Sequence, residues 1–255
     1  MASTSKGLFV WYESLTRDVQ ATIAFYSEVV GWKTQSFSGD YIMWVGSEGP
    51  LGGVMKLPEE AAKQGAPPHW IGYVQVDDVD ATASLARKLG GKICKEPTDI
   101  PTVGRFAVLA DPQGAAIAVF KPDAAMTLHD SSKDGEFCWN ELLTSDSAAA
   151  FRFHSELFGW KVLQDMDMGP MGTYRIFGVG EKRLGGMMAI PKGAPMPPMW
   201  IHYVSTSDLD ATSGRATRKG AKVMNGPMDV PGGGRIAQLT DAQGLAFALH
   251  QGPKK

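Results

Sequence analysis

A short apolar and aromatic run at about positions 8–16 predicts a strand, and a helical pattern follows it directly. Asp18 is suited to begin the helix, because its carboxylate can accept hydrogen bonds from amides of the first turn, and Gly31 is suited to end it. The apolar stripe between them consists of Val19, Ile23, Tyr26 and Val30. Three short strands are expected next, so the predicted unit is βαβββ.

A second unit of the same kind follows in the sequence. A strand is predicted over 70–76, and Asp78 corresponds to Asp18 as the N-cap of the next helix. The glycine pair at 90–91 is expected to end that helix, whose apolar positions are Val79, Leu85 and Leu89. Its three further strands are expected near 92–95, 104–110 and 115–120.

The chain contains this pair of units twice. The segment FVWYESLTRDVQATIAFYSEVVGWK, which starts at Phe9, aligns with FCWNELLTSDSAAAFRFHSELFGWK, which starts at Phe137. Further on, LGGVMKLP aligns with LGGMMAIP, and EPTDIPTVGRFAVLADPQGAAIAVF aligns with GPMDVPGGGRIAQLTDAQGLAFALH. The polar stretch 122–135 has no counterpart and is typical of a linker. We therefore predict two domains, 8–121 and 136–251, with an N-terminal tail at 1–7 and a C-terminal tail at 252–255.

These motifs together resemble the vicinal oxygen chelate superfamily, which groups glyoxalases, bleomycin-resistance proteins and extradiol dioxygenases. The resemblance rests on the βαβββ pairs, the helix ends FYSEVVGW and FHSELFGW, the turns VDDVDA and TSDLDA, and the turns DPQG and DAQG. The Trp-rich first strand and the GxGR loop are similar to its two-domain glyoxalase-like branch. The implied fold is α+β, with tandem glyoxalase-like domains, each built of two βαβββ modules that form a curved, cleft-bearing mixed sheet with helices outside. Several chemistries share this fold, so function needs separate evidence.

Composition excludes several partners. Of the 255 residues, 44% are hydrophobic, and 25 Lys and Arg nearly balance 27 Asp and Glu. Without a basic run, a nucleic-acid backbone has little to attract the chain. The apolar runs are strand-sized and the first residues are polar, so we expect neither a membrane span nor a signal peptide and assign the protein to the cytoplasm. Single-domain relatives usually pair as dimers, and the fusion of two copies in one chain can supply that second domain covalently. We therefore expect a monomer or a homodimer.

The resemblance implies a divalent metal held by His, Glu or Gln at matching strand positions. Those positions hold only non-coordinating side chains, namely Trp11, Val54, Met55, Ile71 and Ala118 in the first copy, and Trp139, Met187, Met188, Ile201 and Ala248 in the second. A new site would need His154, His202 and His250 of the second copy to converge, and strand alternation separates His202 from His250. We therefore predict no metal and no other cofactor.

The same positions define a candidate binding site for a small molecule. Strand alternation places Trp11 and Glu13 on one face, with small side chains expected across the cleft. The candidate ligand-binding residues are Trp11, Tyr41, Trp70, Arg105, Ala118 and Phe120 in the first copy, and Trp139, Tyr174, Trp200, Arg235, Ala248 and His250 in the second. Trp70 and Trp200 are expected to form a roof with the two tyrosines. Alternatively, Trp11 and Trp139 fill the cleft as ordinary core side chains.

Glu13 and Glu141 are the candidate catalytic residues. A carboxylate beside an indole in a partly dry cleft has a raised pKa and suits a general acid or base. Arg105 or Arg235 in the GR position could instead hold each glutamate ionised in a structural ion pair, and we favour this pair. The loops TDIPTVGR and MDVPGGGR could be mobile lids or plain connections.

Three functions remain open from the sequence. The first is a metal-independent protein that binds an apolar or aromatic metabolite. The second is an enzyme acting on a carbonyl-containing substrate, such as a glyoxalase-like lyase or isomerase, with a metal on non-standard ligands or with Glu13 or Glu141 as acid or base. The third is a protein with filled clefts that serves interaction or assembly.

Overall fold

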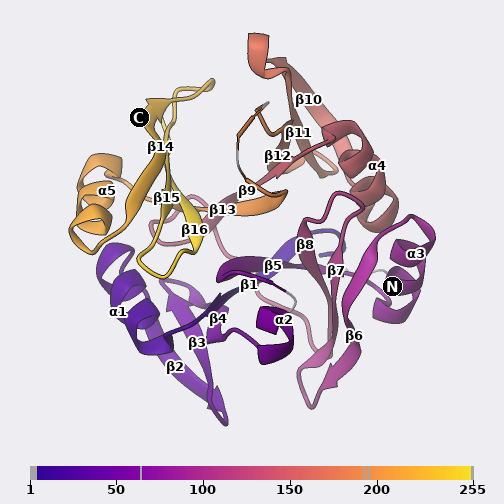
Figure 1. The fold of residues 1–255 in the computed structure, drawn as a ribbon. Helices are drawn as coiled ribbons and strands as arrows, with labels where there is room; N and C mark the ends of the chain where they lie inside the picture. The colour runs from indigo at the N-terminus through magenta and orange to yellow at the C-terminus, as the bar shows by residue number, and fades with distance from the viewer. Residues whose placement is uncertain (1–4, 64, 192, 195, 254–255) are drawn as a thin grey trace. The chain divides into compact units, whose positions relative to one another are not determined.

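The fold was analysed in a computed structural model that describes residues 5–63, 65–191, 193–194 and 196–253. The first copy is drawn in indigo to magenta in Figure 1. Its first module comprises β1 (Phe9–Thr16), α1 (Val19–Val29), β2 (Lys33–Ser38), β3 (Tyr41–Gly46) and β4 (Gly49–Lys56), followed by the short α2 (Glu59–Lys63). Its second module comprises β5 (His69–Gln75), α3 (Val79–Lys88), β6 (Lys92–Ile100), β7 (Gly104–Ala110) and β8 (Ala116–Pro122).

The second copy repeats this element order. Its first module comprises β9 (Phe137–Thr144), α4 (Ser147–Phe158), β10 (Lys161–Asp167), the 3₁₀ helix η1 (Gly169–Met171), β11 (Thr173–Val179) and β12 (Lys182–Ala189). Its second module comprises β13 (Met199–Ser205), α5 (Leu209–Arg218), β14 (Lys222–Asp229), β15 (Arg235–Thr240) and β16 (Ala246–Gln251). The predicted α+β fold with four βαβββ modules is confirmed.

Each main helix begins at an aspartate that the repeat places in the same position. Asp18 and Asp78 cap α1 and α3, and Asp146 and Asp208 cap α4 and α5. In every case the carboxylate accepts a hydrogen bond from the backbone amide three residues later, at 2.9–3.0 Å. These bonds satisfy an amide that the first helical turn leaves unpaired, which is why the motif marks each helix start.

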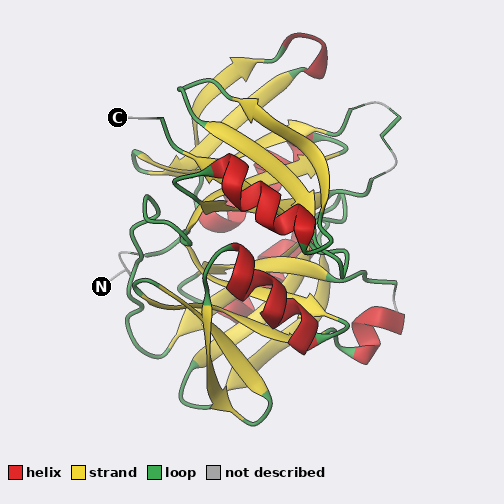
Figure 2. Cartoon of the chain, turned by 90° about the vertical axis from the view of Figure 1, so that its left-hand side faces the viewer, coloured by secondary structure: helices red, strands yellow, loops and turns green. Residues whose placement is uncertain are grey.

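Within the described residues, each copy forms one eight-stranded sheet (yellow strands in Figure 2). The strand orders are β2-β3-β4-β1-β5-β8-β7-β6 and β10-β11-β12-β9-β13-β16-β15-β14. In each module the first strand pairs in parallel with the last, and antiparallel hairpins extend the sheet outward. Both sheets are therefore mixed, as predicted. None of the described helices is long and apolar enough to cross a membrane.

By its packing the chain divides into two compact units, and each unit takes one module from each copy. The first unit comprises Met1–Val10, Ile71–Leu128 and Trp139–Trp200, and the second comprises Trp11–Trp70, His129–Cys138 and Ile201–Lys255. Helices α3 and α4 pack together in the first unit, and α1 and α5 pack together in the second. The helix-facing cores therefore join the two copies.

The first residues of β1 and β9, and the residues just before them, take part in this exchange. In the first unit, Phe9 stacks on Trp160 at 5.6 Å between ring centroids, and the indole of Trp160 donates to the carbonyl of Gly7 at 2.7 Å. In the second unit, Phe137 lies 5.3 Å from Trp32, whose indole donates to the carbonyl of Gly135 at 2.6 Å. Each copy thus supplies an entry segment to the core built around the other copy's first helix.

Candidate functional site

In the second unit, three predicted site residues form one hydrogen-bonded chain. The indole Nε1 of Trp11 donates to the hydroxyl of Tyr41 at 3.0 Å, and that hydroxyl donates to Oε1 of Glu13 at 2.8 Å. Trp11 and Tyr41 are half-buried, whereas Glu13 is only 7% exposed. The strand β1 and the edge-side strand β3 thus bring together residues that lie 28 to 30 positions apart.

The first unit contains the same chain, built from the second copy. Trp139 donates to the Tyr174 hydroxyl at 2.8 Å, which donates to Oε2 of Glu141 at 2.9 Å. Glu141 is 6% exposed, and the two aromatic residues are half-buried. We call the two sets the Trp-Tyr-Glu clusters. Because they lie in different units, each is a complete local arrangement.

The direction of the hydrogen bonds in each cluster follows from the chemistry of its members. An indole nitrogen can only donate, so the tyrosine oxygen must accept from it, and the hydroxyl proton is left to point at the carboxylate. Burial and the adjacent Glu13 carboxylate raise the pKa of Tyr41, and burial and Glu141 do the same for Tyr174. Both tyrosines therefore stay protonated and keep donating to the glutamates.

Strand alternation puts the clusters on the sheet face opposite the helices. Ser14, next to Glu13, accepts from the indole of Trp44 at 3.1 Å, and Trp44 packs against Tyr26 of α1 in the core. Glu13 instead lies beside Gly53 of β4 in the parallel register, and Gly53 faces Met43 of β3. The helix-free face of the first copy therefore combines a polar chain with the thioether side chain of Met43.

Sequence reasoning missed one glycine in each copy that makes room for the tyrosine ring. A Cβ atom added at Gly53 would lie 2.0 Å from the Tyr41 hydroxyl, and one at Gly186 would lie 2.1 Å from the Tyr174 ring. Such contacts are far inside van der Waals distance, so any larger residue displaces the tyrosine. The signal was present, because the LGG motif recurs in both copies.

The remaining predicted residues on this face are placed as strand alternation requires. Ala118 and Ala248 are fully buried, and Phe120 is 6% exposed and packs against Tyr73 at 6.4 Å. His250 is half-buried, and burial lowers its pKa, so the imidazole is neutral at physiological pH.

Two predictions of position are wrong. Trp70 is 5% exposed and donates to the Tyr26 hydroxyl at 2.9 Å, and Trp200 packs on His154 at 5.4 Å. Both indoles lie in helix-facing cores and do not roof a binding site. The reason is strand alternation, since Trp200 shares its face with the core residue Val204.

The predicted ion pairs of the glutamates with arginines are also wrong. Arg105 pairs with Asp80 of α3 at 2.7 Å and with Asp99 at 2.8 Å, and Arg235 pairs with Asp210 of α5 at 2.7 Å. These guanidinium groups point toward the helices, because odd positions of β7 and β15 face that side. Much of the predicted lid segment is strand, since β6 continues to Ile100.

The residues present do not fit a divalent metal. The positions where the fold family would supply ligands hold Trp11, Ile71 and Ala118, and the last two are buried apolar side chains. Across the part of the chain that the structure describes, no three His, Cys, Asp or Glu side chains come together as a ligand set. His202 is held between aromatic rings, 5.0 Å from Tyr12 and 6.3 Å from Phe137.

Both copies match the model of a known family. The model of the Glyoxalase/Bleomycin resistance protein/Dioxygenase superfamily matches residues 9–119 and 138–249, and the chain belongs to this superfamily.

Two curated relatives span nearly the full length. A Mycobacterium tuberculosis protein named "Putative glyoxylase CFP32" is 30% identical, over 94% of this chain and 92% of the relative. The "Anthracycline biosynthesis protein DnrV" of Streptomyces peucetius is 29% identical, over 98% and 94%.

Solved structures confirm the fold alone. A Mn(II)-bound glyoxalase from Novosphingobium aromaticivorans superposes with a TM-score of 0.66 at 15% identity, covering 100% of this chain and 84% of that one. The 2,3-dioxygenase LapB from Pseudomonas sp. KL28 gives a TM-score of 0.68 at 12% identity, covering 99% and 94%. Identities this low carry no information about the reaction.

Proposed function

We propose that this protein binds a planar, apolar or aromatic metabolite without a metal, on the helix-free faces that carry the two Trp-Tyr-Glu clusters. The observation that carries the proposal is the cluster itself. An indole and a phenol remain half-buried, and a hydrogen-bond chain fixes their orientation. Aromatic side chains held in this way give a ligand a preformed surface on which to stack, so little ordering entropy is lost on binding.

The duplication supports a binding role. Both copies keep the same three residue types and the same donor order, while the surrounding residues differ, with Met43 in the first copy and Ile176 in the second. One relative is named for anthracycline biosynthesis, and anthracyclines contain a planar, fused aromatic ring system. A stacking ligand with a carbonyl or hydroxyl group at its rim suits both the indole and the neighbouring tyrosine–glutamate pair.

Indole N–H resonances test the proposal directly. Protein labelled with ¹⁵N is titrated with 1,8-dihydroxyanthraquinone and then with a panel of planar aromatic compounds. The Trp11 and Trp139 resonances are expected to shift saturably, whereas those of Trp32 and Trp160, which bond to core carbonyls, stay in place. Trp11→Phe and Trp139→Phe are expected to weaken binding by about tenfold at their own sites. If neither resonance responds to any compound, the proposal is wrong.

Metal independence has a separate test. Protein purified and dialysed without chelator is analysed for zinc, nickel, manganese and iron. Only a small fraction of one equivalent of any metal is expected, because the inherited ligand positions hold Trp11, Ile71 and Ala118. One equivalent of any of these metals per copy would contradict this part of the proposal.

Acid–base chemistry is the second candidate function. It is favoured by the finding that tyrosine hydroxyls donate to Glu13 and Glu141, while Arg105 and Arg235 pair with aspartates. A carboxylate in reach of a substrate can act as a general base and take a proton from the carbon next to a carbonyl. The test is deuterium exchange from solvent into dihydroxyacetone. Exchange that the protein catalyses, and that is lost in Glu13→Gln and Glu141→Gln, would favour this function over binding alone.

A further inference from the structure

The helix-free face of each sheet extends onto the strands of the second module, where the two copies can be compared residue by residue. In the first copy these residues belong to the first unit, and in the second copy they belong to the second unit. Paired residues of neighbouring strands share a face of the sheet. The register gives one matched row in each copy, namely Tyr73, Ala118 and Val108 in the first and Tyr203, Ala248 and Gln238 in the second.

Next to each row, a ring on the last strand rests over a glycine. A Cβ atom added at Gly104 would lie 2.8 Å from Cε2 of Phe120, and one at Gly234 would lie 2.9 Å from Nε2 of His250. The phenyl ring and the imidazole therefore occupy matching places in the two copies. What differs between the copies at this position is the chemistry of the ring.

In the first copy the surroundings of the ring are apolar and aromatic. Tyr73 lies 6.4 Å from Phe120 and 6.2 Å from Phe106 between ring centroids, and Val108 completes the row. Phe106 and Val108 are only half-buried. Apart from the Tyr73 hydroxyl, these four side chains offer a ligand stacking and dispersion contacts. We call them the apolar patch.

In the second copy the same positions carry polar groups. Gln238 stands where the first copy has Val108, and its amide nitrogen donates to the Tyr203 hydroxyl at 2.7 Å. His250 is half-buried, and its imidazole forms no hydrogen bond with the other described residues. Burial lowers the pKa of His250, so the neutral ring offers one donor and one acceptor nitrogen. With Ile236, which pairs with His250 across β15, these residues form the polar patch.

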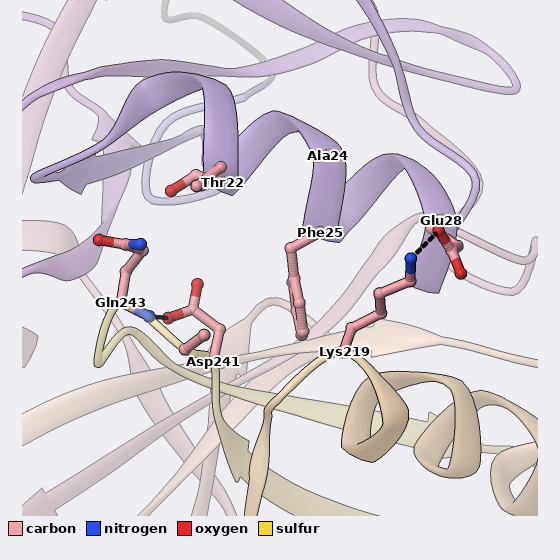
Figure 3. A pocket seen from close by; sticks show the side chains of 9 residues that line it. Thr22, Ala24, Phe25, Glu28, Lys219, Asp241 and Gln243 are labelled. Carbon is pink, nitrogen blue, oxygen red and sulfur yellow. Dashed lines mark hydrogen bonds and ion pairs between the residues drawn. The ribbon is translucent and has the colours of Figure 1, made fainter.

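The second unit also contains a pocket of about 280 Å³ between α1 and the turn that joins β15 to β16 (Figure 3). Its buried acid, Asp241, accepts from the Leu245 amide at 2.9 Å and meets the hydroxyl of Tyr26. On the rim, Lys219 and Glu28 pair with 2.6 Å between Nζ and Oε2. These charged groups are engaged by the protein itself, unlike the imidazole of the polar patch.

We propose that His250 makes the second copy bind a hydroxylated aromatic ligand in preference to an unsubstituted one, whereas the first copy shows no such preference. The ligand hydroxyl donates to the acceptor nitrogen of the imidazole, and the aromatic ring packs on Ile236. An uncharged imidazole cannot offset the desolvation of a carboxylate or an ammonium group, so a neutral hydroxyl is the substituent that it suits. The inference rests on the proposed function, because it requires that an aromatic ligand lies on the helix-free face.

Phenol and fluorobenzene are the probes for the experiment, since they have nearly the same shape and fluorine cannot donate a hydrogen bond. Full-length ¹⁵N-labelled protein is titrated with each compound. The backbone amides of Gln238 and His250 report on the polar patch, and those of Val108 and Phe120 report on the apolar patch. The polar patch is expected to bind phenol about threefold to tenfold more tightly than fluorobenzene, and the apolar patch is expected to bind fluorobenzene at least as tightly. The same preference in both patches, or no saturable shift of the polar patch with phenol on the order of ten millimolar, would overturn the inference.

Exchanging the two rings between the copies gives matched variants. His250→Phe should abolish the preference of the polar patch for phenol, and Phe120→His should create one in the apolar patch. His250→Gln keeps a neutral donor and acceptor and should retain part of the preference, which a merely structural role would not predict. An unchanged preference in His250→Phe would overturn the inference, and the other two variants test it if His250→Phe does not fold.

Failure of this inference can be told apart from failure of the proposed function. If the Trp11 and Trp139 indole resonances respond to aromatic compounds but the two patches do not differ in preference, only the role of His250 is wrong. If neither the indoles nor the patches respond to any compound, the proposed function and this inference are both wrong.

Discussion

The two compact units share one local arrangement but differ in the side chain that packs on it. Each contains a buried aspartate turn, and each packs that turn against the first helix of the other copy. In the first unit the helix presents His154 and the acid is partnered, whereas in the second it presents Tyr26, whose hydroxyl accepts from Trp70. The difference shows that a duplicated turn acquires its chemistry from the residue that packs on it.

The largest expected effect comes from removing the histidine of the first unit. His154→Phe keeps an aromatic ring in the core but leaves the buried Asp111 carboxylate without its nitrogen partner, so the free energy of unfolding should fall by about 3–5 kcal/mol. Tyr26→Phe removes a neutral acceptor of Trp70 and should cost about 1–2 kcal/mol. Urea unfolding measures both. Equal losses would contradict the comparison.

Replacing the glycine next to each cluster tyrosine should destabilise the two units to a similar extent. Gly53→Ala and Gly186→Ala force Tyr41 and Tyr174 out of their clusters, and each should lower the free energy of unfolding by about 2–3 kcal/mol. The matching indole N–H resonance, of Trp11 or Trp139, should lose its hydrogen-bonded shift. Unfolding curves and ¹⁵N spectra check this, and a change in only one copy would show that the clusters are not equivalent.

The second unit should lose stability in mild acid because of His202. Burial, and to a lesser degree His69, lowers the pKa of His202 to about 3, below the roughly 6.5 of an unfolded chain. The unfolded state therefore binds more protons than the folded state over this pH range. The free energy of unfolding should fall as the pH drops from 6.5 toward 3, and the loss should reach about 2 kcal/mol at pH 5. The corresponding residue of the first copy is Gly72.

Urea unfolding between pH 7 and pH 4.5 measures this loss. His202→Gln removes the titrating ring and should flatten the pH dependence over that range. A variant that retains the full pH dependence would show that another group is responsible.

The smallest effect concerns the entry segments. Trp32→Phe and Trp160→Phe remove the indole bonds to the carbonyls of Gly135 and Gly7, and each should cost about 1–2 kcal/mol. Similar losses would confirm that the exchange between the copies is reciprocal. Thermal unfolding followed by circular dichroism resolves the two values, and a marked inequality would indicate that one copy depends more on the other.

Much of the fold could be predicted from sequence because local physical chemistry specifies it. Asp18 and its three counterparts mark helix starts, since a short carboxylate at that position caps unpaired amides. Alternation along β1 placed Trp11 and Glu13 together for the same local reason. The site was predicted less well, because the identity of a hydrogen-bond partner depends on residues far apart in the chain.

The sequence by itself determined the duplication, the order of elements and the face on which Trp11, Glu13 and their counterparts lie, because periodicity and capping act over a few residues. Only the tertiary structure decided that Tyr41 holds Glu13 while Arg105 pairs with Asp80. It also decided that the buried Asp111 meets the imidazole of His154, whereas the matching Asp241 meets the hydroxyl of Tyr26. Those outcomes depend on which module packs on which helix. Nothing in the local pattern of either partner encodes that pairing.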